Sequence, residues 1–111
     1  MKNVMTIDGQ QAVITYDPDI EMFRGEFVGL NGGADFYAPD VAGLRREGEL
    51  SLNAFMDECA KRGIEPHKNF SGKFVLRVAP EVHHAAAIAA AANGESLNQW
   101  VAGAIQEAAH A

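Results

Sequence analysis

Apolar and polar residues alternate along three short stretches near the start of the chain, as they do in strands with one buried face. The first covers residues 11–16 and ends at Asp17-Pro18-Asp19, a turn signature. The second covers residues 22–30 and is followed by Asn31-Gly32-Gly33, which tolerate the positive φ of a hairpin. The third covers residues 34–38. The pattern predicts an antiparallel meander within a small sheet of three to four strands.

A stretch with helical spacing follows. Asp40 is a suitable N-cap residue, Lys61 and Arg62 suit the carboxyl end of a helix dipole, and Gly63 suits the C′ position. Apolar residues between these ends recur every three or four positions, namely Val41, Leu44, Leu52, Phe55, Met56 and Cys59. One helix lying across one face of a small antiparallel sheet predicts an α+β domain over residues 1–63.

Residues 64–72 show no periodicity and contain a proline, an asparagine and a glycine, which is typical of a linker. Residues 73–79 then alternate like a strand, and Pro80 ends it. One face of this strand carries Phe74, Leu76 and Val78, and the other carries Lys73, Val75 and Arg77. The strand is followed by two predicted helices.

The first of these helices covers residues 81–92 and ends at Asn93-Gly94, where either residue can adopt the left-handed conformation. Ser96 caps the second helix, which extends from residue 97 to about residue 108. Its apolar face consists of Trp100, Val101, Ala104 and Ile105. Residues 73–111 therefore form a β-α-α module.

The strand of this module has no partner within the chain. A module of about 40 residues rarely folds alone, and the simplest pairing is with the same strand of a second chain, antiparallel about a two-fold axis. We therefore expect a homodimer, or a tetramer built from it. The expected dimer core consists of Phe74, Leu76, Val78 and Trp100.

The β-α-α module resembles the ribbon-helix-helix repressors of the Arc, MetJ and CopG group, whose two-stranded ribbon enters the DNA major groove. The resemblance implies that Lys73, Val75 and Arg77 face the bases, with Arg77 suited to guanine and Val75 to a thymine methyl group. It also implies that the start of the second helix binds a DNA phosphate through backbone N–H groups and the helix dipole. The residues at that start are Ser96, Leu97 and Asn98.

More narrowly, three segments are similar to the C-terminal module of HicB-family antitoxins. They are Gly72-Lys73-Phe74-Val75-Leu76-Arg77-Val78, Pro80-Glu81-Val82-His83 and Ser96-Leu97-Asn98-Gln99-Trp100-Val101. The resemblance extends over roughly residues 10–109, with Tyr16-Asp17 closing the first strand. Gly48 departs from it, because a large apolar residue is expected there. The family resemblance implies a partial RNase H-like fold joined to a DNA-binding module.

The same resemblance implies the function. The N-terminal domain of such an antitoxin binds the HicA toxin, a small basic mRNA interferase with a catalytic histidine, and covers its active site. The C-terminal module represses the operon by binding operator DNA. The alternative is a ribbon-helix-helix dimer that acts as a protein-interaction module or a simple repressor without a toxin partner.

Charge is divided unevenly along the 111 residues. The net charge of −6 argues against nucleic-acid binding through bulk electrostatics. Residues 1–69 carry 7 basic and 12 acidic groups, a net −5, whereas residues 70–111 carry 2 and 3, a net −1. The acidic part suits a basic protein partner, and solubility alone would also explain it.

The sequence also predicts where the protein resides. Cys59 is the only cysteine, which excludes an intramolecular disulfide and fits a reducing cytosol. Lys2 is not followed by the apolar run of a signal peptide. The longest apolar tract, residues 85–92, is too short to span a bilayer. We expect a cytoplasmic protein without a membrane partner.

An RNase H-like fold invites an enzymatic interpretation, for which the candidate carboxylates are Asp8, Asp17, Asp19, Glu21, Glu26 and Asp35. Two-metal hydrolysis needs carboxylates that converge on ions about 4 Å apart, and their spacing does not require convergence. The four histidines lack zinc-site spacing with Cys59, and they are His67, His83, His84 and His110. We expect no catalytic residue, no metal ion and no cofactor.

Overall fold

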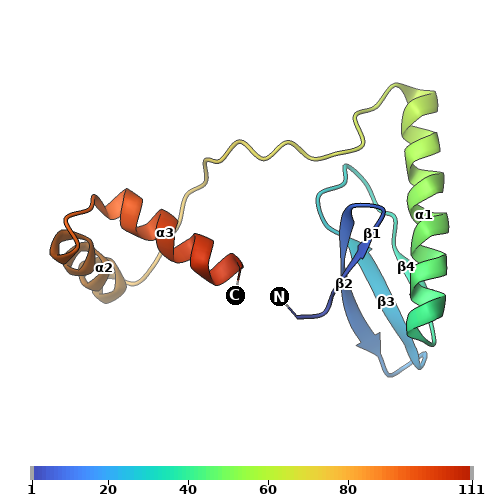
Figure 1. Cartoon of the computed structure of the whole chain (residues 1–111), viewed down its shortest axis with the longest axis horizontal. Coiled ribbons are helices and arrows are strands. Elements are labelled where there is room, and N and C mark those ends of the chain that lie inside the picture. The colour runs from blue at the N-terminus through green and yellow to red at the C-terminus, as the bar shows by residue number, and fades with distance from the viewer. Residues whose placement is uncertain (1, 111) are drawn as a thin grey trace. The chain divides into compact units, whose positions relative to one another are not determined.

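The computed structural model describes residues 2–110, and the chain divides into two compact units, Lys2–Ser71 and the residues from Gly72 onward. The N-terminal unit contains β1 (Val4–Ile7), β2 (Gln10–Asp17), β3 (Met22–Phe27), β4 (Phe36–Ala38) and α1 (Val41–Arg62) (Figure 1). The C-terminal unit contains α2 (Pro80–Ala92) and α3 (Leu97–Ala109). The N-terminal unit is of the α+β class, as the sequence predicts.

The sheet is an antiparallel meander with the strand order β1-β2-β3-β4. The three predicted stretches correspond to β2, β3 and β4, and β1 is the additional strand. A tight turn joins β1 to β2, with positive φ at Asp8 and Gly9. The turn predicted at Asp17-Pro18-Asp19 joins β2 to β3, and the Asp19 N–H donates to Asp17 Oδ1 at 3.0 Å.

The prediction for the end of β3 is wrong in two respects. The strand ends at Phe27 rather than at residue 30, and the positive φ belongs to Gly29 rather than to Asn31-Gly32-Gly33. The physical reason lies in residues 65–68, which we call the strap. Leu30 forms an isolated antiparallel bridge with His67 of the strap, so this loop pairs with a distant part of the chain instead of forming a tight hairpin.

Four hydrogen bonds hold the strap against this loop. The Asn31 N–H donates to the Pro66 carbonyl at 2.8 Å, and the Lys68 N–H donates to the Gly29 carbonyl at 2.8 Å. Asn31 Nδ2 donates to the carbonyl oxygens of Glu65 and His67, both at 2.9 Å. Four of the nine residues predicted as linker are therefore attached to the N-terminal unit.

Helix α1 begins and ends at the predicted residues. Asp40 Oδ1 accepts a hydrogen bond from the Gly43 N–H at 2.6 Å. Gly63 ends the helix with φ 65°, and the Ile64 N–H donates to the Cys59 carbonyl at 2.9 Å. The helix lies across one face of the sheet (Figure 1), and Leu44 and Leu52 are part of the core between them.

The expectation of a large apolar residue at position 48 is wrong. A Cβ atom on Gly48 would lie 2.3 Å from Ile7 Cδ1 and 3.1 Å from two atoms of the Phe36 ring. Ile7 and Phe36 are both buried, so they have little freedom to move away. Helix α1 thus approaches the sheet so closely at this point that a side chain at position 48 has no room.

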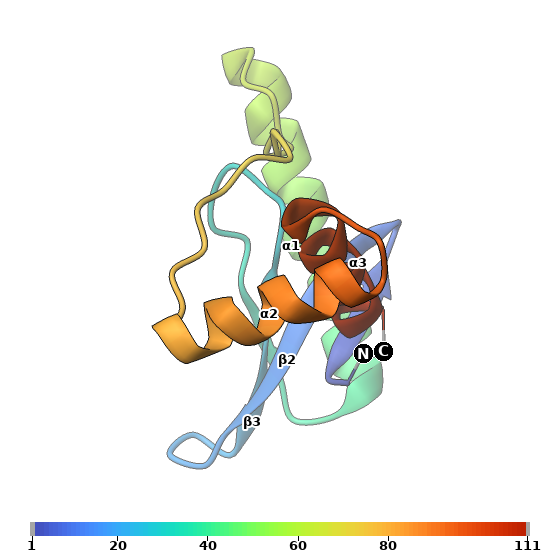
Figure 2. The same cartoon turned by 90° about the vertical axis from the view of Figure 1, so that its left-hand side faces the viewer.

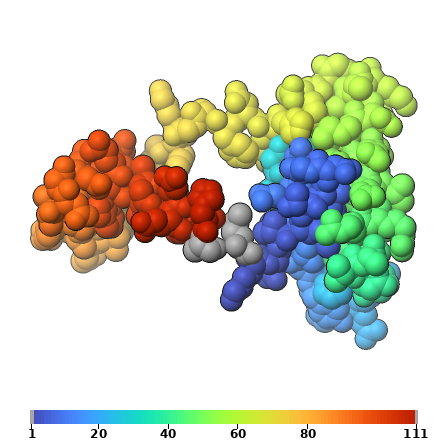
Figure 3. Space-filling view, in the orientation of Figure 1, coloured from blue at the N-terminus to red at the C-terminus, as the bar shows by residue number. Residues whose placement is uncertain are grey.

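The C-terminal unit is a helical hairpin of α2 and α3 (Figure 2). Gly94, at φ 68°, adopts the left-handed conformation after α2, and Pro80 is the first residue of that helix. The strand predicted over residues 73–79 is not formed in the single chain. A strand requires hydrogen bonds to a neighbouring strand, and none of the described strands pairs with this segment. The yellow segment of the space-filling view leads from the end of α1 toward α2 (Figure 3).

Candidate functional site

The C-terminal unit has almost no core of its own. Among its described residues only Ala90 is buried. Its large apolar side chains are instead mostly exposed, with exposed fractions of 72% for Phe74, 58% for Leu76 and 55% for Val82. A stable unit of this size does not leave such side chains in water. These side chains therefore form an exposed apolar surface.

An apolar groove of about 960 Å³, which we call the C-terminal groove, gathers most of these side chains. Phe74, Leu76 and Val78 line it from the segment before α2, as the predicted alternation requires. The helices contribute Val82 from α2 and Trp100, Val101 and Ile105 from α3. The structure thus brings together the four residues predicted for the dimer core, and it adds Val82 and His83, which the sequence analysis did not assign to the site. The sequence could have indicated Val82, because it is one of only two large apolar residues of α2.

The three residues predicted to face DNA bases are not equivalent in the structure. Val75 is 93% exposed, and neither it nor Arg77 lines the C-terminal groove. Lys73 does line that groove, as its neighbour Phe74 does. Val75 and Arg77 therefore lie outside the groove in the single chain, whereas Lys73 lines it.

The predicted phosphate-binding residues lie at the start of α3. Ser96 and Gln99 form a reciprocal capping box, in which the Gln99 N–H donates to Ser96 Oγ at 3.1 Å and the Ser96 N–H donates to Gln99 Oε1 at 3.0 Å. The Ser96 N–H is therefore already used. The N–H groups of Leu97 and Asn98 have no acceptor inside the helix, because they belong to its first turn. These two groups are the available anion donors at this end.

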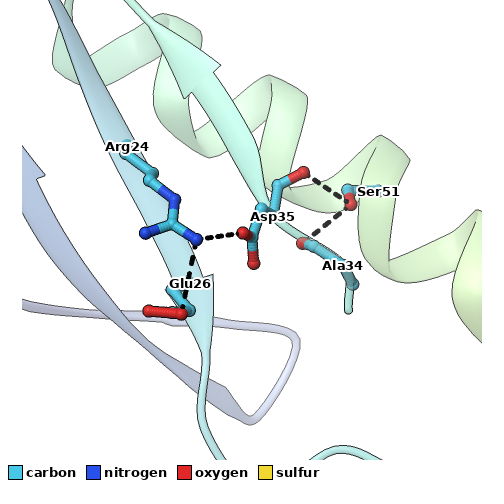
Figure 4. Close-up of polar contacts among 5 residues, drawn as sticks. All are labelled: Arg24, Glu26, Ala34, Asp35 and Ser51. Carbon is cyan, nitrogen blue, oxygen red and sulfur yellow. Dashed lines mark hydrogen bonds and ion pairs between the residues drawn. The ribbon is translucent and has the colours of Figure 1, made fainter. Parts of the chain in front are cut away.

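In the N-terminal unit, two of the candidate carboxylates surround a guanidinium group (Figure 4). Arg24 Nη2 donates to Asp35 Oδ2 and, at 3.4 Å, to Glu26 Oε1. The hydrogen bond to Asp35, followed by the charges of Asp35 and Glu26, raises the pKa of Arg24 above its ordinary value. Ser51 Oγ of α1 donates to the Ala34 carbonyl at 2.9 Å and so fixes the chain just before β4. These two carboxylates are thus paired with one guanidinium group.

The other candidate groups are dispersed. Among residues 2–110 no three His, Cys, Asp or Glu side chains are close enough to hold a metal ion. Cys59 is buried on α1, and His83 lines the C-terminal groove whereas its neighbour His84 does not. His67 lies in the strap, 3.3 Å from Glu65 Oε1 through Nδ1.

The model of the HicB family matches residues 55–105 of the chain. These 51 of the 111 residues are similar to the HicB family. No curated protein and no solved structure matches the chain.

The matched part begins near the end of α1 and continues through the strap and the segment before α2 into α3. It includes every residue assigned to the candidate DNA-binding and dimer surface. The four strands lie outside it. No helix in the described part of this HicB-like chain is long and apolar enough to cross a membrane.

Proposed function

We propose that the chain is the antitoxin of a HicAB-type toxin–antitoxin system. Its N-terminal unit masks the active site of a HicA-like mRNA interferase and has no catalytic role of its own. Its C-terminal unit joins two chains into a ribbon-helix-helix homodimer. This homodimer binds operator DNA and represses the operon.

The single observation that carries the proposal is the missing core of the C-terminal unit. Two copies of residues 73–79, paired antiparallel, give each segment a strand partner and place Phe74, Leu76 and Val78 of both chains over the C-terminal grooves. Burial of one large apolar side chain contributes about 1.5–3 kcal/mol. Six such side chains contribute as much as the whole stability of a small domain, about 5–15 kcal/mol. Folding of this unit is therefore coupled to dimerisation.

The outward face of the paired segments supplies the contacts to DNA. A two-stranded ribbon fits the major groove, where Arg77 can donate two hydrogen bonds to guanine and Val75 can contact a thymine methyl group. The N–H groups of Leu97 and Asn98 at the positive end of α3 suit a phosphate. Lys73 and Arg77 are the only lysine or arginine residues after position 69. Few phosphates are neutralised, so tight binding needs a second dimer or the bound toxin.

The N-terminal unit suits the toxin by charge. Residues 1–69 carry a net charge of −5, and an enzyme that cleaves RNA presents a basic surface to its substrate. Opposite charges accelerate association and exclude wrong partners. Inhibition then requires only that the antitoxin cover the active site.

The low positive charge of residues 70–111, a net −1, favours one alternative, a dimer that serves only as a protein-interaction module. Binding to the promoter region of the chain's own operon separates the two functions. The repressor protects one site on that DNA and ignores a scrambled duplex. A dimer that serves only as a protein-interaction module shows no difference in binding between the two duplexes.

Co-expression with the product of the adjacent reading frame tests the antitoxin function. We expect the two proteins to co-purify, and we expect the chain to stop RNA cleavage by that protein at a stoichiometric ratio. Unchanged cleavage in the presence of excess folded chain contradicts the proposal.

A further inference from the structure

A second, smaller groove lies in the N-terminal unit, between the sheet and the first turns of α1. It measures about 220 Å³ and we call it the α1 groove. It is lined by Asn3, Val4, Met5, Ile14, Phe23, Val41 and Leu44. The β2–β3 hairpin and the start of α1 lie at the same end of the unit (Figure 1).

The floor of the α1 groove is apolar and continuous with the core. Leu44 is 1% exposed, and Met5, Ile14 and Phe23 are partly buried hydrophobic residues packed against the core. At the edge, Val41 is 63% exposed. Tyr16 extends the apolar surface, because its ring contacts that of Phe23 with a centroid distance of 5.4 Å.

The surroundings of this groove are acidic. All its lining residues come from two stretches, residues 3–23 and 36–44, which contain no lysine, arginine or histidine. The carboxylates of these stretches are Asp8, Asp17, Asp19, Glu21 and Asp40. Asp8 follows Ile7 at the end of β1 away from the groove, whereas the next three are in or beside the β2–β3 turn and Asp40 is the N-cap of α1.

Of the described basic residues that flank these stretches, only Arg24 is paired with carboxylates. Arg24 alternates with Phe23 along β3, so it is on the other face of the sheet, where it is paired with Asp35 and Glu26. Arg45 Nη1 donates to the Thr6 carbonyl at 3.1 Å. Lys2, which precedes Asn3, and Arg46, which follows Arg45 on α1, are both exposed, and the structure gives neither of them such a partner on the described chain. The groove therefore has an apolar floor and is acidic on the side of the β2–β3 turn, which carries Asp17, Asp19 and Glu21.

We infer that the α1 groove is the docking site for an apolar side chain presented by a basic protein surface. The volume of 220 Å³ is below the roughly 300–1,000 Å³ of small-molecule pockets, which favours a single anchoring side chain. A buried apolar anchor within a polar rim is the usual arrangement of an interface hot spot. The inference rests on the proposed function, in that the basic protein is the HicA-like toxin.

Two substitutions in one helix test the groove in the full-length chain. Val41→Arg places a cation at its edge, and Leu50→Arg is the matched control, since Leu50 is 59% exposed on α1 and does not line the groove. Affinity for the toxin is measured by calorimetry. We expect Val41→Arg to weaken binding about 10-fold or more, as loss of a hot spot does, and Leu50→Arg to change it less than about 2-fold. Thermal unfolding and operator binding report whether each variant is folded.

The acidic edge is tested by the double variant Asp19→Asn/Glu21→Gln. Both residues are exposed and both changes keep side-chain size, so folding is preserved. We expect slower association with the toxin at low salt and a weaker salt dependence, because long-range attraction is reduced. This variant tests the inference even if Val41→Arg does not fold. An unchanged association rate at low salt contradicts the acidic edge.

The outcomes separate this inference from the proposed function. If wild type binds the toxin and Val41→Arg behaves like Leu50→Arg, the groove is not the docking site and the antitoxin function stands. Loss of binding in Val13→Arg instead, on the opposite face of the sheet, also overturns the inference. If Val41→Arg changes the oligomeric mass of the chain measured without toxin, the groove binds a second copy of the chain, and this also overturns the inference. If wild type does not bind the toxin, the proposed function fails and the inference fails with it.

Discussion

The ring of Phe36 occupies the space in which a side chain of Gly25 would lie. The two residues are direct partners in the β3–β4 register. A Cβ atom on Gly25 would be 2.1 Å from Phe36 Cζ and 2.3 Å from Cε2. The opposite side of this ring faces α1 at Gly48, where a Cβ atom would be 3.1 Å from the same two atoms. The ring thus lies between two glycines, and both are required by space rather than by backbone conformation.

Gly25→Ala and Gly48→Ala should therefore destabilise the N-terminal unit. Overpacking a core costs about 1–3 kcal/mol, which for Gly48 exceeds the roughly 1 kcal/mol that alanine contributes in a helix. Chemical denaturation of the full-length chain measures the free energy of unfolding. Gly103→Ala is the control, because a Cβ atom there meets nothing within 4 Å in the described chain. We expect that control to be neutral or stabilising, and a Gly48→Ala variant as stable as wild type would contradict the close approach of α1.

The strap provides a second prediction. Asn31→Ala removes the two hydrogen bonds from Nδ2 to the Glu65 and His67 carbonyl oxygens. We expect a loss of about 1 kcal/mol in the free energy of unfolding, together with faster hydrogen exchange at Lys68, whose N–H donates to Gly29. Asn53→Ala, in the exposed part of α1, is the control and should not destabilise the chain. Equal exchange rates at Lys68 in both variants would show that Asn31 does not hold the strap.

The N-terminal unit should act without the rest of the chain. Its whole core cluster belongs to residues before the strap, and the last hydrogen bond of the strap is made by Lys68. A fragment that ends at Lys68 should therefore fold and still inhibit RNA cleavage by the toxin, with association that slows as salt rises. An RNA-cleavage assay with the fragment and the full chain checks this. A folded fragment that leaves cleavage unchanged would show that neutralisation depends on the dimer.

The sequence was sufficient where a local signal decides the structure. The cap at Asp40, the end at Gly63 and the cap at Ser96 are read from single residues at fixed positions, whereas the reciprocal bond from Gln99 was not predicted. It was insufficient where contacts join distant parts of the chain. The pairing of Leu30 with His67 leaves no periodic pattern, and the need for glycine at position 48 depends on Ile7 and Phe36.

In the candidate site, too, local signals were read from the sequence and contacts with other segments were not. The alternation of residues 73–79 predicted Phe74, Leu76 and Val78 on one side, and all three line the C-terminal groove. A strand, however, requires hydrogen bonds to a neighbour, and the single chain does not provide one. Lys73 lines the C-terminal groove in this state, so alternation alone did not predict its position.

Arg77 and Lys73 should differ in their effect on DNA. Arg77→Ala is expected to cost about 1–3 kcal/mol on the operator and to relax specificity at one base pair, because it removes a bidentate contact to guanine. Lys73→Ala should weaken binding to all sequences more evenly and reduce the salt dependence. Titrations on operator and scrambled duplexes distinguish the two. If Arg77→Ala weakens both duplexes equally, Arg77 binds a phosphate instead of a base.

The pairing of two chains through residues 73–79 is the central claim, and the mass of the chain in solution tests it most directly. Leu76 and Val75 are neighbours on opposite faces of this segment, so Leu76→Glu and Val75→Glu add the same charge to the groove side and to the outward side. Light scattering over a dilution series should give at least twice the 11.9 kDa chain mass for wild type and for Val75→Glu, and a monomer for Leu76→Glu. A wild-type chain that is monomeric at micromolar concentration with α2 and α3 folded would contradict the account.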